Sequence, residues 1–137
     1  MFTGTASIGE PVLDFAKSAA NENINIWRSG ITKMSFAIFN GGSACTVATS
    51  NTMLQNNWLT IVAKYTSATM TMELRVGSVV DVQTNTALRT DRSVDLTYIG
   101  RSSRAQDPYL SGKIAGLYAL DALLSDVEIS ELSNKIY

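Results

Sequence analysis

The sequence predicts an all-β fold in which two antiparallel sheets pack face to face. Residues Thr69 to Val76 alternate polar and apolar side chains, which is the period of a half-buried strand. Further apolar runs follow at intervals of about eight to twelve residues with turn residues between them, as in β-sandwiches. A helical pattern occurs only in the last residues. The 137 residues are therefore assigned to one domain, 1–137, which is long enough to bury a sizeable core.

The first strands are indicated by short apolar runs with clear ends. Val12, Leu13 and Phe15 follow Pro11, which favours a strand at or near a sheet edge. After a polar turn at 21–25, the run 24–28 predicts a second strand. Met34, Phe36 and Ile38 alternate in a third, and Asn40-Gly41-Gly42 is a strong turn signal after it.

The middle of the chain holds the most regular patterns. Residues 44–48 predict a brief strand, and 58–65 are apolar at nearly every position, as in a strand covered on both faces. Trp58, which opens this run, is expected in the core. In the next strand the inward and outward sets are Met70, Met72, Leu74 and Val76 against Thr69, Thr71, Glu73 and Arg75.

The C-terminal forty residues predict a strand ending at Ile99, a polar loop over 100–107, an apolar strand over 113–120 and a short helix. Ser125 followed by Glu128 is the pattern of a capping box, which marks a helix start. Ile129, Leu132 and Ile136 then fall on one helix face.

These residues resemble the laminin-G-like jelly-roll domains of the concanavalin-A-like lectin/glucanase superfamily. In that family a strand ends in Ile-Gly, then come a loop, a Tyr/Phe-x-Gly-x-Ile strand, an apolar-Tyr-x-x-Asp segment and a Leu-Ser-x-x-Glu-Ile helix. The matching residues are Ile99-Gly100, Tyr109 to Ile114, Leu117 to Asp121 and Leu124 to Ile129, with Asp14-Phe15 and Phe36 to Gly41 in the early half. The resemblance implies a jelly-roll sandwich in which 58–65 crosses the middle of one sheet.

The chain departs from the family pattern at two places. Family members begin with a further strand, for which the eleven residues before Val12 leave too little room. Either the chain is a fragment, or a homo-oligomer or a partner chain completes the sheet edge. In addition, Val76 is followed directly by Gly77, which leaves the register of 77–82 open.

Composition excludes several function classes. A net charge of −1 offers no basic face for nucleic acid, and no apolar run is long enough for a membrane span. With no His and a single Cys, Cys45, the usual zinc ligands and a Ser-His-Asp triad are missing. We expect Cys45 to be a small buried or half-buried side chain; the alternative is a reactive thiol. Asp126 and Glu128 form the only close acid cluster, but they sit in the first turn of a helix. We therefore expect no enzymatic activity.

Calcium is the one cofactor left open. Asp81, Asp91, Asp95 and Asp107 lie between Gly77 and the end of the polar loop, and carboxylates in such loops are suitable Ca²⁺ ligands. The alternative is that each is a solvated surface carboxylate.

A ligand-binding rim is the other candidate site. Arg89, Arg92, Arg101 and Arg104 lie around the strand that ends at Ile99, with Tyr109 nearby. Arginine binds carboxylate or sulfate groups bidentately, so an acidic or sulfated glycan would be a natural ligand. Pairing with the interleaved aspartates is the alternative. Trp27 is out of phase with Ile24 and Ile26, so it is either an exposed platform for a sugar ring or a seal on the sandwich.

These observations lead to an expected function. We expect a non-catalytic binding or adhesion module that recognises a glycan or a protein at the cell exterior, extracellular or at the cell surface. The alternative is a structural jelly-roll subunit within a multi-chain assembly, and a glycoside hydrolase is a distant third.

Overall fold

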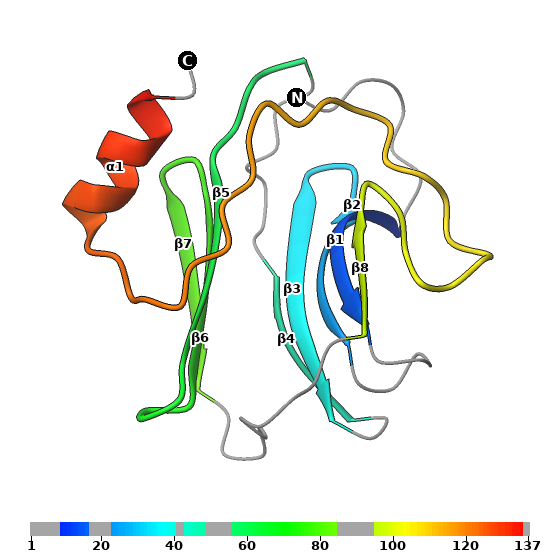
Figure 1. Ribbon diagram of the computed structural model, residues 1–137, viewed down its shortest axis with the longest axis horizontal. Coiled ribbons are helices and arrows are strands. Elements are labelled where there is room, and N and C mark those ends of the chain that lie inside the picture. The colour runs from blue at the N-terminus through cyan, green and yellow to red at the C-terminus, as the bar shows by residue number, and fades with distance from the viewer. Residues whose placement is uncertain (1–8, 17–22, 41–42, 49–55, 85–94, 136–137) are drawn as a thin grey trace.

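The computed structural model describes residues 9–16, 23–40, 43–48, 56–84 and 95–135. Two antiparallel sheets face each other, one of five strands in the order β4-β3-β2-β1-β8 and one of three in the order β5-β6-β7 (Figure 1). A single short helix, α1, ends the described chain. The predicted all-β two-sheet sandwich with a C-terminal helix is confirmed.

The five-stranded sheet places β1 in its interior. Its strands are β1 (Glu10–Ala16), β2 (Ile24–Gly30), β3 (Lys33–Asn40), β4 (Ser43–Ala48) and β8 (Leu96–Ile99). Strand β1 pairs with both β2 and the edge strand β8, so it lies one strand from the edge, in agreement with the predicted position at or near a sheet edge. Pro11 is tolerated because the register shifts between Pro11 and Leu13, and pairing with β8 begins only at Leu13.

The three-stranded sheet consists of β5 (Ile61–Thr66), β6 (Thr71–Val76) and β7 (Val79–Thr84). Strand β6 is central, so the central position expected for 58–65 is wrong: β5 pairs only with β6 among the described strands. The register of 77–82 is fixed by a two-residue turn, with Val76 opposite Val79. Gly77 opens that turn with a φ of 58°, a conformation that glycine adopts at little cost.

The core lies between the two sheets. It is made by the buried side chains of Met34, Phe36, Ile38, Val47, Met72, Leu74 and Val76, with Ile24, Ile26 and Ile61 packed against them. Burying each large apolar side chain contributes about 1.5–3 kcal/mol. The inward prediction for β6 therefore holds from Met72 onward. It is wrong for Met70, which has a φ of 47° and lies in the turn before the strand.

The two sides of the sandwich differ. On one side β4 contacts β6 and β7. On the other side a cleft of about 480 Å³ opens between the inner faces near β5 and β1, with a mostly apolar lining. Trp58 borders this cleft and is 44% exposed, so its predicted place in the core is wrong.

Residues 113–120 run beside β5 along the opening (Figure 1) but do not form the predicted strand. An isolated bridge occurs at Gly112, just before this segment, and residues 113–120 themselves make no sheet ladder. The segment contains Gly116 and two alanines, which have low strand propensity. Its large apolar side chains are consequently exposed by 39% to 55%: Ile114, Leu117, Tyr118 and Leu120. Ile114 is therefore not part of the buried core.

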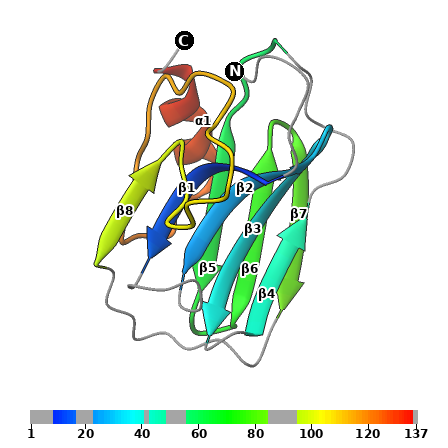
Figure 2. The ribbon, with the colours of Figure 1, turned by 90° about the vertical axis from the view of Figure 1, so that its right-hand side faces the viewer.

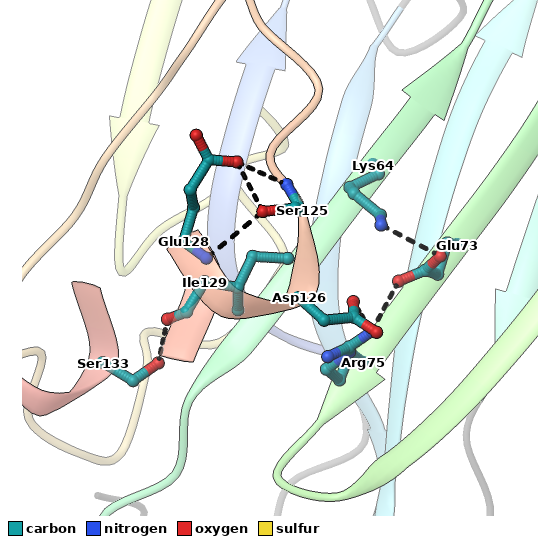
Figure 3. A network of polar contacts seen from close by, with 8 residues as sticks. All are labelled: Lys64, Glu73, Arg75, Ser125, Asp126, Glu128, Ile129 and Ser133. Carbon is teal, nitrogen blue, oxygen red and sulfur yellow. Dashed lines mark hydrogen bonds and ion pairs between the residues drawn. The ribbon is translucent and has the colours of Figure 1, made fainter. Parts of the chain in front are cut away.

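Helix α1 (Asp126–Asn134) lies on the far side of the three-stranded sheet from the five-stranded one (Figure 1). The predicted capping box is confirmed, because Glu128 N donates to Ser125 Oγ while Ser125 N donates to Glu128 Oε2 (Figure 3). Within the helix, the Ile129 side chain is buried. Asp126 Oδ1 lies 2.6 Å from Nη2 of Arg75 on β6. This contact explains why Arg75 and Glu73, expected to face water, are only 18–19% exposed.

Candidate functional site

The outer face of the five-stranded sheet, the face turned away from the three-stranded sheet, carries most of the described candidate residues. Ile24, Ile26 and Phe36 pack on the core, so the alternate residues of β2 and β3 point outward. One row across the sheet consists of cross-strand partners: Tyr98 on β8, Asp14 on β1, Asn25 on β2 and Ala37 on β3.

Asp14 is fully buried although it belongs to the outer face. The loop after β8 supplies two of its partners: Ser103 N donates to Asp14 Oδ2 at 2.7 Å, and Ser102 Oγ donates to the same oxygen at 3.3 Å. Figures 1 and 2 show that the loop after β8 lies beside the outer face of this sheet. The buried carboxylate therefore acts as the anchor of residues 100–110, hereafter the arginine loop.

Two asparagines complete the anchor. Asn23 Nδ2 donates both to Asp14 Oδ1 and to Ser103 Oγ, each at 3.1 Å. The hydrogen bonds of Asn25 are satisfied when its Nδ2 faces Asp14 Oδ1, at 2.6 Å. Hydrogen bonds to a charged acceptor are stronger than those between neutral groups, so these contacts hold the loop firmly on the sheet.

The two ends of the arginine loop are also fixed. Gly100 N donates a hydrogen bond to Val12 O at 3.0 Å, and Leu110 N donates one to Gly100 O at 2.9 Å. Ser111 N then donates to Oε2 of Glu10, which forms a buried ion pair with Arg28 at 3.6 Å. The loop is thus held at its base, its centre and its end.

The arginine loop directs its two arginines onto aromatic rings of the outer face. Arg101 is exposed, and its Cζ lies 4.6 Å from the centroid of the Tyr98 ring. Arg104 is half-buried, with its Cζ 5.9 Å from the Phe39 ring. Both distances are within the range of a cation–π contact. The rings restrict where each guanidinium can lie.

Four of the six predicted binding residues are described. Arg101, Arg104 and Trp27 all lie on the outer face but at separate places: Arg101 is over Tyr98, Arg104 is over Phe39, and Trp27 is half-buried opposite Pro11 and Ser35. Trp27 faces away from Ile24 and Ile26, as predicted. Tyr109 lies in the arginine loop and is 73% exposed. Arg89 and Arg92 lie outside the described residues.

The predicted metal residues are spread over the molecule. Asp81 belongs to β7 of the other sheet, Asp95 precedes β8 and Asp107 follows it in the arginine loop. Asp91 lies outside the described residues, as does the side chain of Cys45. Within the described ranges, no three His, Cys, Asp or Glu side chains are grouped so as to hold a metal ion.

Asp126 and Glu128 have structural roles in the described fold. Asp126 pairs with Arg75, and the hydrogen bonds from the hydroxyl and backbone N–H of Ser125 lower the pKa of Glu128 below its ordinary value. Their helical placement agrees with the reading of these acids as first-turn residues.

Sequence reasoning missed the anchor itself. Asp14 is an acid within an apolar strand, which can signal a buried carboxylate, but nothing local links it to Ser102 and Ser103. The link depends on β8 pairing with β1.

Comparison with known proteins yields one structural similarity. No protein-family model matches the sequence, and no curated protein matches it. The fold is similar to the crystal structure of residues 221–444 of an S-layer domain-containing protein from Clostridium thermocellum, with a TM-score of 0.42 and 21% identity, over 97% of this chain and 67% of that one. In the described part of the chain, no helix has the length and apolar character needed to cross a bilayer.

Proposed function

We propose that this chain is a non-catalytic, laminin-G-like binding module that recognises an acidic or sulfated glycan at the cell exterior. The observation that supports this proposal is the arginine loop, which is anchored on buried Asp14 and presents Arg101 and Arg104 on one sheet face. Holding a loop in one conformation before binding lowers the entropic cost of association.

The chemistry of the outer face suits such a ligand. Guanidinium groups bind carboxylate and sulfate through paired N–H donors. Trp27 on the same face and the exposed ring of Tyr109 could contact the apolar side of a sugar ring. The module would therefore combine charge recognition with ring stacking.

The test is calorimetric titration with matched neutral and sulfated oligosaccharides. We expect binding of the sulfated forms, weakened about tenfold in Arg101→Ala, which corresponds to the loss of one charge-assisted contact. Lys33→Ala is the matched control, because Lys33 is exposed at the start of β3 and its removal changes the net charge equally. We expect less than a twofold effect from it. Equal losses in both variants, or no binding of sulfated saccharides, would contradict the proposal.

A second candidate is a structural subunit that packs within an assembly of several chains. It is favoured by the open apolar cleft and by the exposed side chains beside it, among them Leu117 and Tyr118. Exposed apolar patches of this kind commonly mark protein interfaces.

Sedimentation over a range of concentrations tests this alternative. A subunit should associate, and Leu117→Ser with Tyr118→Ser should shift it toward the monomer. A wild-type chain that stays monomeric up to millimolar concentration would contradict it.

A further inference from the structure

The apolar cleft opens between the inner faces of the two sheets, whereas the arginine loop lies on an outer face. The cleft follows β5 from Ile61 to Tyr65, a length on the order of 13 Å at the rise of a strand. Its volume of about 480 Å³ is within the roughly 300–1,000 Å³ that small-molecule sites have. The side chains that line it include Leu13, Phe15, Ile24, Ile26, Ile61 and Leu117. An elongated apolar space of this kind suits a linear hydrocarbon chain.

A second, more polar cleft adjoins the apolar one at the end of β5. It has a volume of about 400 Å³ and is lined by Thr66 and Ser67 of the turn between β5 and β6, and by Asp121. Both clefts share part of their lining, namely Ala63, Lys64, Tyr65, Leu120 and Ala122. The two spaces therefore meet along the end of β5, one with an apolar character and one with a polar character.

The Tyr65 side chain lies where the two clefts meet and carries a buried polar atom. Its ring packs against the core, while its Oη is buried and has no hydrogen-bond partner among the described residues. A buried hydroxyl without a partner is unfavourable, and buried polar groups in native folds are rarely left in this state. A ligand oxygen beside Tyr65 Oη would supply the missing hydrogen bond.

Residues 113–120, which run beside β5 along the opening, are the part of the lining that moves at the lowest cost (Figure 1). They make no sheet ladder, and Leu117, Tyr118 and Leu120 are 46–55% exposed. A segment with few backbone hydrogen bonds and little buried apolar area opens locally more readily than a strand within a sheet. Because Tyr65 Oη is covered in this conformation, a ligand reaches it when a side chain such as Leu120, which lines both clefts, moves outward.

We infer that the joined clefts bind a monoacyl amphiphile with an uncharged, hydroxylated headgroup, of the class of the monoacylglycerols. The acyl chain lies along the apolar cleft, and a headgroup oxygen accepts a hydrogen bond from Tyr65 Oη in the polar one. This ligand is separate from the glycan proposed above and uses none of the residues of the outer sheet face.

The charges around the clefts favour an uncharged headgroup. Asp121 adds a carboxylate to the lining of the polar cleft. Neither lysine of the lining is free, because Lys64 Nζ pairs with Glu73 Oε2 at 3.2 Å and Lys113 is also engaged. An anionic headgroup would therefore lose its hydration without gaining a free cation.

Trp58 provides the readout, because it borders the apolar cleft and is 44% exposed. The variant Trp27→Phe leaves Trp58 as the only tryptophan and is the parent for the fluorescence titrations. Addition of 1-monodecanoylglycerol below its critical micelle concentration should shift the emission to shorter wavelength in a saturable way, since the acyl chain excludes water from the indole. Glycerol should give no shift, and decanoate should bind at least fivefold more weakly. Calorimetry on the wild-type chain should give the same affinities without the Trp27 substitution.

Three variants locate the ligand. Tyr65→Phe removes only the hydroxyl and should weaken binding of 1-monodecanoylglycerol about fivefold, the effect of one hydrogen bond. It should not lower the melting temperature, because the hydroxyl has no partner among the described residues. Ala122→Phe puts a ring where the clefts meet and should weaken binding at least tenfold. Ser130→Ala is the control, since it removes an exposed hydroxyl of α1 outside both clefts, and it should change the affinity less than twofold.

Each contrary result overturns the inference in a distinct way. An unchanged affinity in Tyr65→Phe, or a lower melting temperature, would give the hydroxyl a role other than ligand binding. Decanoate binding more tightly than 1-monodecanoylglycerol would overturn the headgroup. An affinity that falls as the protein concentration rises would show that a second copy of the chain covers the cleft. None of these results changes the expected titration with sulfated saccharides, so this inference and the proposed function fail independently.

Discussion

The backbone N–H of Ser103 donates a hydrogen bond of 2.7 Å to Oδ2 of Asp14, across 89 residues of sequence. This contact joins the loop after β8 to β1 and positions both arginines of the outer face. It also makes Asp14 the residue whose replacement should affect stability and binding together.

Asp14→Ala should destabilise the fold by about 3 kcal/mol, because the buried donors of Ser103 and Asn23 lose a charged acceptor. Urea unfolding measures the loss, and hydrogen exchange should show faster exchange at the Ser103 amide. Asp95→Ala is the matched control, since Asp95 is exposed, and it should change stability by less than about 0.5 kcal/mol. Similar losses in the two variants would contradict the anchor role.

The buried ion pair of Glu10 and Arg28 gives a second prediction. Arg28→Met should cost about 3–5 kcal/mol because it leaves the Glu10 carboxylate buried without its cation. The double variant Glu10→Met/Arg28→Met should cost less than the single one, although the Ser111 amide then loses an acceptor. Thermal unfolding of the three proteins compares them. A double variant less stable than Arg28→Met would show that the charges do not compensate each other.

Leu74→Ala tests the core. Leu74 is fully buried on β6 between the sheets, so truncation should destabilise the protein by about 2–5 kcal/mol. Val82→Ala on the neighbouring strand β7 is the control, because Val82 is 60% exposed, and it should have an effect below about 0.5 kcal/mol. The denaturant midpoints of the two variants measure both effects. A loss of stability below about 2 kcal/mol in Leu74→Ala would mean that neighbouring side chains fill the space that Leu74 leaves.

The capping box predicts a pH dependence for α1. Hydrogen bonds from Ser125 lower the pKa of Glu128, the side-chain bond more than the backbone bond. The cap contribution is therefore fully present above the ordinary glutamate pKa of about 4.3 and is lost as the pH falls through the lowered value. Ser125→Ala removes the larger cause and should raise the Glu128 pKa part of the way toward normal. Carboxyl chemical shifts from an NMR titration measure it, and an unchanged pKa in Ser125→Ala would rule out this cause.

Sequence reasoning predicted the local elements of this fold. The alternation of Met72, Leu74 and Val76 identified the inner face of β6, and Ser125 with Glu128 identified the start of α1. These patterns depend on neighbours in the sequence. The sheet class follows from them, because alternating strands must bury one face.

The errors concern partners that are distant in the sequence. Trp58 looks like a core residue, but the cleft beside β5 leaves it 44% exposed. Residues 113–120 are an apolar run that lies beside β5, yet they make no ladder with it. The same applies to the candidate site: placing Arg101 and Arg104 on the sheet face that carries Trp27 requires the pairing of β8 with β1, which no local pattern supplies.

Strand β1 (Glu10–Ala16) pairs with β8 (Leu96–Ile99), which follows it in the chain only after six other described strands. Contacts between such distant positions slow folding, since the chain between them must be ordered before they form, and a domain of this topology is expected to fold in milliseconds to seconds. On the ribosome, the hairpins of β1 to β4 can assemble while Asp14 is still hydrated. Only when Ser103 has emerged can that carboxylate be covered and the two guanidinium groups be set in place. The surface proposed to recognise glycans is thus completed only after the hairpins of β1 to β4 have formed.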